Sequence, residues 1–201
     1  MSYASLAELR DGLRHGQADP AWAKKMLHPV PELPSVKDRV RYLVEKVTGK
    51  VVLDIGCTGP ISAALKQAAS RYYGVDRTTG DWVVADMDVD PASLPVYEDV
   101  ECVVVSELLE HLANPGWFLC AVRDKYPGRD VYLTVPNAGA YQVKGTDEVV
   151  NGDHVAWYSY TTLTTLLARC GFTVERVRWY NGPPHTAEGL IVVATSDATV
   201  L

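Results

Sequence analysis

The feature that most constrains the fold is a series of short apolar runs that alternate with helix-like segments. The runs are residues 51–55, 72–76, 82–85, 100–105 and 130–135. They are rich in β-branched residues and apolar on both faces, as is typical of strands buried in a parallel sheet. Helix-like segments cover 61–71, 114–125 and 159–170. The alternation predicts an open, mostly parallel α/β sheet.

The C-terminal part of the chain has a different pattern. Two strand-like runs, 172–180 and 189–195, are separated by the turn-rich segment NGPPHTAE. Such a pair is typical of an antiparallel hairpin, and we expect it at the edge of the sheet.

Length and proline placement indicate the domain organisation. A chain of 201 residues suits one well-buried domain. Residues 1–50 contain helix-like segments near 3–15, 20–27 and 36–48, with the proline-rich link HPVPELP between the last two. We therefore expect a single domain, 1–201, in which a helical cap (1–50) precedes an α/β core (51–201).

Composition excludes several classes of protein. The net charge of −6 argues against broad phosphate contact, so no nucleic-acid partner is expected. The four cysteines form no CxxC pair and no secretory signal is present, which predicts a reducing cytoplasm, no disulfides and no metal. No apolar run reaches the roughly 18–20 residues of a membrane helix, so no membrane association is expected.

Acidic residues recur where the predicted parallel strands end. They are Asp54, Asp76, Asp86 and Glu107. Ligands of open α/β sheets bind at these strand ends. The first turn has Gly56-Cys57-Thr58-Gly59 instead of GxGxxG, and Asp54 would repel a pyrophosphate there. A ligand with a positive end and no phosphates, such as S-adenosylmethionine, fits better.

Several stretches within 51–177 resemble class I S-adenosylmethionine-dependent methyltransferases, which have a Rossmann-like fold. The matching stretches are VVLDIGCTGP, YYGVDRT, VVADMD, VVVSELLEHLANP, LTVPNA and DHVAWYSYTTLTTLLARCGFTV. The resemblance implies S-adenosyl-L-methionine as cofactor and S-adenosyl-L-homocysteine as product. It assigns the cofactor site to Asp54, Gly56, Cys57, Gly59, Asp76, Arg77, Asp86, Met87, Ser106 and Glu107.

The resemblance also implies individual roles. Asp54 and Gly56 would hold the methionine end, and Asp76 would bind the ribose hydroxyls. Asp86 and the Met87 backbone would contact the adenine, while Ser106 and Glu107 would border the methyl group. One departure is that the family expects glycine where this chain has Thr58, followed by Gly59 and Pro60. The loop must therefore take a different path here.

The segment SELLEHL follows the fourth strand. If it is helical, Glu107, Glu110 and His111 share one face, and Leu108, Leu109 and Leu112 share the other. The leucines would then pack on the sheet, and the polar face would point to solvent or to the cleft. His111 is a candidate base, or alternatively a structural histidine paired with Glu107 or Glu110.

Residues 136–160 form a long irregular connection that we expect to carry acceptor specificity. Tyr141, Trp157 and Tyr158 are candidate substrate-binding residues, although Trp157 and Tyr158 can equally belong to the core. His154 is the second catalytic candidate, because an unperturbed histidine titrates near pH 6.5.

The sequence favours a methyltransferase that acts on an O or N atom of a small-molecule, sugar or lipid-like acceptor. One alternative is a cofactor-binding protein of the same fold that regulates a partner instead of catalysing. The other is an NAD(P)-dependent oxidoreductase, which Asp54 and the missing GxGxxG disfavour. The oligomeric state is left open.

Overall fold

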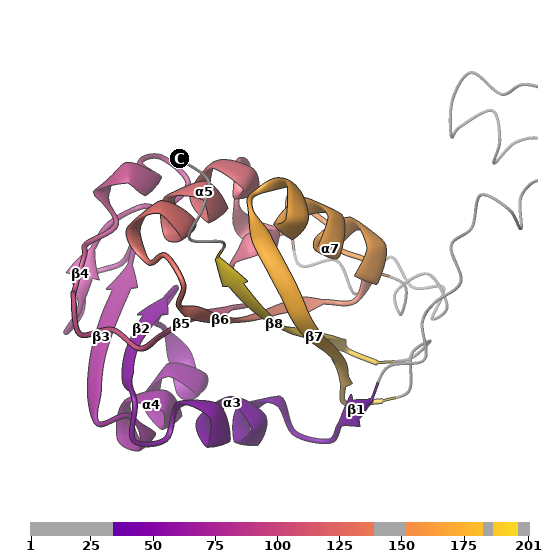
Figure 1. Cartoon of the computed structure of the whole chain (residues 1–201), viewed down its shortest axis with the longest axis horizontal. Helices are drawn as coiled ribbons and strands as arrows, with labels where there is room; N and C mark the ends of the chain where they lie inside the picture. The colour runs from indigo at the N-terminus through magenta and orange to yellow at the C-terminus, as the bar shows by residue number, and fades with distance from the viewer. Residues whose placement is uncertain (1–33, 139–151, 183–186, 197–201) are drawn as a thin grey trace, which may run out of the picture. The chain divides into compact units, whose positions relative to one another are not determined.

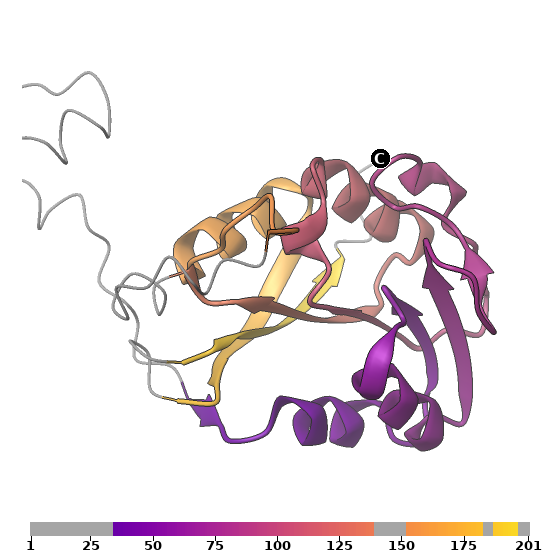
Figure 2. The same cartoon turned by 180° about the vertical axis from the view of Figure 1, so that it is seen from behind.

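The computed structural model describes residues 34–138, 152–182 and 187–196, and these form one α/β sheet with helices on both faces (Figures 1 and 2). The strands, in the order β1-β7-β8-β6-β5-β2-β3-β4 across the sheet, are β1 Ser35–Val36, β7 Phe172–Tyr180, β8 Gly189–Ser196, β6 Asp130–Pro136, β5 Cys102–Ser106, β2 Val51–Ile55, β3 Arg71–Asp76 and β4 Val83–Val84.

The strand directions confirm the predicted mostly parallel sheet. The central strand β2 pairs parallel with β3 and β5, and β5 pairs parallel with β6. The C-terminal hairpin is antiparallel, as predicted. However, β8 also pairs antiparallel with β6, so the last strand lies inside the sheet, between β6 and β7, and β7 lies nearer the edge.

The edge beyond β7 was not predicted. Residues 35 and 36 form β1, which pairs parallel with the end of β7 at Trp179 and Tyr180. The helix expected from residue 36 therefore starts later, at Arg39. Asp38 caps it, because the Asp38 side chain accepts a hydrogen bond of 3.0 Å from the Arg41 amide.

The α-helices that the structure describes are α3 Arg39–Val47, α4 Gly59–Ala68, α5 Pro115–Lys125 and α7 Tyr160–Arg169, and short 3₁₀ turns form η1 Pro91–Ser93 and η2 Leu109–His111. Their boundaries follow local signals. Ser159 and Thr162 form a reciprocal capping box at the start of α7. Pro115 follows the N-cap Asn114 in α5, as predicted.

The helices form a layer on each face of the sheet. In Figures 1 and 2, α3 and α4 lie below the sheet, and α5 and α7 lie above it. Side chains alternate between the faces along β2. Leu53 and Ile55 pack in the same cluster as Phe118 of α5, whereas Val52 packs with Leu65 of α4. Asp54 lies two positions from Val52 and therefore faces α4.

The predicted helical cap is described only in part. Its segments 3–15 and 20–27 lie outside the described residues, and α3 corresponds to the third. The division into a cap and a core remains a prediction. Among the described helices, none combines the length and apolar character that crossing a bilayer would require.

Candidate functional site

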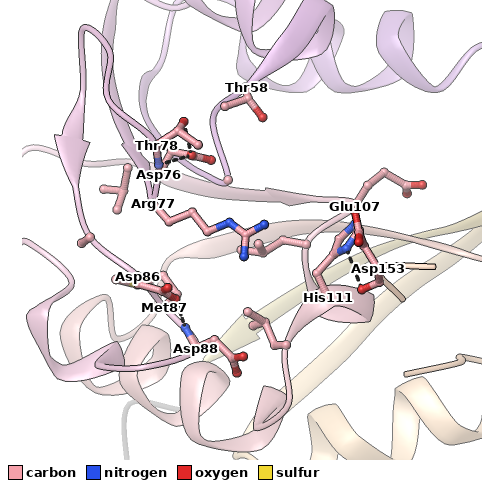
Figure 3. Close-up of a pocket in the computed structure, with 15 residues that line it drawn as sticks. Thr58, Asp76, Arg77, Thr78, Asp86, Met87, Asp88, Glu107, His111 and Asp153 are labelled. Atoms are coloured by element: carbon pink, nitrogen blue, oxygen red, sulfur yellow. Dashed lines mark hydrogen bonds between the residues drawn. The ribbon is translucent and has the colours of Figure 1, made fainter. Parts of the chain in front are cut away.

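A cavity of about 250 Å³ lies where β2, β3 and β5 end (Figure 3). Its walls come from five segments: the turn after β2, the end of β3 with the loop that follows it, the segment after β4, the η2 region after β5, and Asp153. The lining residues are Gly56, Thr58, Val75, Asp76, Arg77, Thr78, Ala85, Asp86, Met87, Asp88, Glu107, Leu108, His111, Leu112 and Asp153. Five of them are carboxylates and one is an arginine, so the cavity favours a ligand with positive charge.

The turn after β2 requires glycine at its first position. Gly56 has a φ of +81°, a conformation that side-chain-bearing residues rarely adopt. The Gly56 amide donates to the Val75 carbonyl at 2.8 Å, which ties the turn to β3. Thr58 then serves as N-cap and α4 begins at Gly59, which also has a positive φ, +82°. The departure from the family pattern is thus accommodated at the start of α4. Cys57 and Gly59 do not line the cavity.

Asp54 is buried beneath α4 and does not line the cavity. Its side chain is 1% exposed, and the Tyr72 hydroxyl donates to its Oδ2 at 2.7 Å. Burial is the largest influence on the Asp54 carboxyl and raises its pKa to about 6. A contact between Asp54 and the methionine amino group stays a prediction.

Asp76 and Arg77 lie at the end of β3 and line the cavity. The Asp76 Oδ1 atom accepts hydrogen bonds from the amide and the hydroxyl of Thr78, at 2.7 and 2.6 Å. Among the described residues, none donates to Asp76 Oδ2, so that atom can accept from a ligand hydroxyl. Figure 3 shows the Arg77 side chain extending across the cavity toward Glu107 and His111.

Asp86 and Met87 form the next part of the wall, and their contacts with an adenine stay a prediction. The Asp86 Oδ1 atom accepts from the Asp88 amide at 2.9 Å. Asp88 in turn accepts from the Ala113 amide at 2.8 Å. These bonds hold the acidic loop against the segment that follows η2, so it is not a freely solvated run of charge.

Glu107 is fixed by three side chains from distant parts of the chain. Its carboxylate accepts from Arg39 at 2.7 Å, from Thr134 at 2.9 Å and from Tyr180 at 3.2 Å. Its backbone has a φ of +52°, which is unusual for a residue other than glycine. Such strained backbone conformations cluster at functional sites. Ser106 shares a hydrogen bond of 2.9 Å with Thr134 and does not line the cavity.

The predicted helix over SELLEHL was wrong. Only Leu109–His111 form a 3₁₀ turn, because the left-handed Glu107 prevents a helix from starting there. The expected faces are wrong only in part: Leu108 lines the cavity and Glu110 is 1% exposed. Glu107 and His111 do line the cavity, and Leu109 is buried. Burial raises the pKa of Glu110 to about 8, and the charge of Glu107 contributes further.

The two candidate histidines lie together, although they are far apart in sequence. Their ring centroids are 4.7 Å apart with the rings nearly perpendicular. His111 lines the cavity, and its Nδ1 atom lies 3.2 Å from the Asp153 carbonyl. His154 does not line it. Burial, and then the charge of His111, lowers the pKa of His154.

The candidate substrate residues differ in their surroundings. Tyr158 is buried, and its hydroxyl donates to the Leu109 carbonyl at 3.2 Å, which favours the core alternative. Trp157 is 40% exposed, and its ring centroid lies 5.9 Å from that of His154. Neither lines the cavity. Tyr141 lies outside the described residues.

Sequence reasoning missed several residues of the site. Thr58, Thr78, Leu108 and Asp153 line the cavity. Arg39 was also missed, and it holds Glu107 from α3. The turn residues after β2 and β3 could have been proposed from their positions at strand ends, but the sequence carries no signal for a contact between Arg39 and Glu107.

Comparisons with known proteins agree with this geometry. The family model described as "Methyltransferase domain" matches residues 26–177. No curated protein matches the sequence significantly.

Solved structures of methyltransferases share the fold at low sequence identity. An S-adenosylmethionine-dependent methyltransferase from Archaeoglobus fulgidus has 18% identity and a TM-score of 0.62, over 79% of this chain and 91% of that one. The 1,6-didemethyltoxoflavin-N1-methyltransferase of Burkholderia thailandensis, with bound S-adenosylhomocysteine, has 14% identity and a TM-score of 0.61, over 95% and 86%. The small RNA methyltransferase HEN1 has 14% identity and a TM-score of 0.64, over 81% and 25%.

The match of the family model over most of the chain, together with the Rossmann-like sheet, bears out the resemblance and the predicted cofactor. The chain belongs to the S-adenosylmethionine-dependent methyltransferase family.

Proposed function

We propose that this protein transfers a methyl group from S-adenosylmethionine to an oxygen or nitrogen atom of a small molecule, including sugar or lipid-like acceptors. The observation that supports this most is the charge of the cavity at the strand ends, where five carboxylates and one arginine line about 250 Å³. A cofactor with an ammonium and a sulfonium is attracted to such a site, whereas a pyrophosphate is repelled. The same charge disfavours a dinucleotide.

Separate residues of the cavity can bind separate parts of the cofactor. Asp76 Oδ2 can accept from a ribose hydroxyl, while Oδ1 is held by Thr78. Asp86 and Met87 line the wall where an adenine would lie. Glu107 is held rigid by Arg39, Thr134 and Tyr180, so it needs little rearrangement when a ligand enters. Such preorganisation keeps the cost of binding low.

The acceptor side would be formed by the histidines. When bound, S-adenosylmethionine supplies an electrophilic methyl group, so the protein mainly aligns a nucleophile and excludes water. The lowered pKa of His154 favours its neutral form, which can accept a proton from the acceptor. His111 lines the cavity and would therefore be the histidine nearer the cofactor. We further propose that residues 136–160 carry acceptor specificity, that residues 1–50 act as a cap within a single domain, and that the protein works in the cytoplasm.

Ligand binding and turnover test the function separately. We expect S-adenosylhomocysteine to raise the melting temperature and NADH to leave it unchanged. Transfer of a labelled methyl group should then be screened over phenolic, amine, sugar and lipid-like acceptors, with a structured RNA as an additional arm. Stabilisation by NADH alone would refute the methyltransferase proposal. Cofactor binding without transfer to any acceptor would favour the regulatory alternative, and transfer to RNA alone would refute the small-molecule acceptor.

A further inference from the structure

Beside the cavity, one carboxylate and two imidazoles converge. The Glu110 carboxylate and the rings of His111 and His154 each offer a ligand atom, and these atoms all lie within 4.8 Å of one another. The residues come from two segments, the η2 turn and the stretch that precedes α7. The convergence is therefore a product of the fold and not of a local sequence motif.

Glu110 is the residue that most needs an explanation. It is 1% exposed, and among the described residues neither of its carboxylate oxygens has a hydrogen-bond partner. A buried carboxylate without partners is costly, and buried charges are usually paired or bind a metal. The arrangement of His111 and His154 beside it supplies the remaining ligands for a cation.

The hydrogen bond of His111 leaves its second ring nitrogen available as a metal ligand. The His111 Nδ1 atom lies 3.2 Å from the Asp153 carbonyl. A carbonyl oxygen can only accept, so Nδ1 carries the proton, and in the neutral ring the lone pair is on Nε2. Histidines that bind metals commonly donate their other ring N–H to a backbone carbonyl in this way.

The two segments are also tied together by backbone hydrogen bonds. The Val155 and Ala156 amides both donate to the Glu110 carbonyl, at 2.8 and 3.1 Å. The Tyr158 hydroxyl donates to the neighbouring Leu109 carbonyl at 3.2 Å. His154 is thereby held beside Glu110 and His111, which is the preorganisation that a metal site requires.

From this geometry we propose that Glu110, His111 and His154 bind one first-row divalent transition cation. Two imidazoles and a carboxylate suit Zn²⁺, Mn²⁺ or Co²⁺ better than Mg²⁺, which prefers oxygen ligands. Ligand atoms around a tetrahedral ion, at about 2.0–2.2 Å from it, are roughly 3.3–3.6 Å apart, so atoms that lie within 4.8 Å of one another need to close by at most about 1.5 Å, a movement that side-chain rotation can supply. This departs from the sequence-based prediction of no metal, which relied on cysteine spacing.

The position of the site also suggests what the ion does. His111 and Asp153 line the cavity, so the ion would lie at its wall with coordination positions open toward it. An acceptor with a hydroxyl or carboxylate oxygen can fill such a position. This part rests on the proposed function, and it makes the histidines metal ligands instead of free bases.

Metal binding can be measured without an acceptor. The full chain, free of any affinity tag, is titrated with Zn²⁺, Mn²⁺ and Mg²⁺ by calorimetry, and Co²⁺ binding is followed by its visible spectrum. Mn²⁺ is included because the four free cysteines bind it poorly. We expect one Zn²⁺ or Mn²⁺ per chain with a Kd of about 10 µM or lower, and much weaker binding of Mg²⁺.

Variants then assign the ligands. Glu110→Gln keeps the shape of the buried side chain, and His154→Ala removes a half-buried ring; each should weaken Mn²⁺ binding at least about tenfold. Glu45→Gln, at an exposed carboxylate on α3, is the matched control and should bind within about twofold of the parent. Should Glu110→Gln fail to fold, His154→Ala and the Co²⁺ spectrum still decide.

The outcomes separate this proposal from the function. A parent protein that binds no Mn²⁺ or Zn²⁺, or variants that bind both as the parent does, would overturn the metal site even if S-adenosylhomocysteine binds normally. A parent protein that binds Mn²⁺ but does not bind S-adenosylhomocysteine would overturn the proposed function and leave the metal site standing.

Discussion

Replacing Asp54 by Asn tests whether a buried carboxylate next to the cavity costs the fold stability. The Asp54 side chain is 1% exposed and its Oδ2 accepts from the Tyr72 hydroxyl. Burial raises its pKa from 3.8 to about 6, although hydrogen bonds from Tyr72 and Ser62 oppose the rise. Asn keeps the size of the side chain and an acceptor oxygen for Tyr72, but it carries no charge.

The sign and size follow from the two pKa values. Between pH 3.8 and about 6, the unfolded chain has lost a proton that the folded protein keeps, so stability falls as the pH rises and the loss is complete above about pH 6. At about 1.36 kcal/mol per pH unit, the difference amounts to at most about 3 kcal/mol. We expect Asp54→Asn to exceed the parent in stability by about 1–3 kcal/mol at pH 7.5, and this gain to shrink toward pH 4.

Urea unfolding at four pH values between 4 and 7.5 measures this difference. Asp99→Asn, at an exposed carboxylate that pairs with Arg71, is the matched control and should show no comparable pH-dependent gain. A stability difference between Asp54→Asn and the parent that is the same at every pH would refute the reasoning. The same variant tests the contact with the methionine amino group. If Asp54 makes that contact, its replacement should weaken the binding of S-adenosylhomocysteine at least about tenfold.

Three further predictions concern ligands. Asp76→Asn should weaken S-adenosylhomocysteine by roughly 1.5–3 kcal/mol in calorimetry, because it loses charge-assisted bonds to the ribose; equal affinity, with Asp81→Asn as control, would assign Asp76 to the turn alone. Arg77→Ala should improve the affinity for S-adenosylmethionine relative to S-adenosylhomocysteine about two- to fivefold, because the guanidinium repels the sulfonium. An unchanged ratio of the two affinities would mean that Arg77 does not lie near the sulfonium of the bound cofactor. His154→Ala should lower turnover or raise the acceptor's KM while S-adenosylhomocysteine affinity stays within about twofold; a sharp loss of that affinity contradicts an acceptor-side role.

The sequence by itself determined most of the helices and strands and several residues that line the cavity. Hydrophobic alternation and capping depend on neighbouring residues, so the strands from β2 to β8 and the start of α7 at Ser159 could be predicted. Asp76 and Asp86 could be placed at the cavity because the carboxyl ends of parallel strands meet at one edge of the sheet.

The tertiary structure alone decided the surroundings of Glu107 and Glu110. Helical spacing put both acids on one polar face, but the left-handed backbone at Glu107 ends that periodicity and turns Glu110 into the interior. The contact of Glu107 with Arg39, like that of His111 with His154, joins segments that are distant along the chain. Such contacts depend on how the layers pack, and packing leaves no periodic signal in the residues that meet.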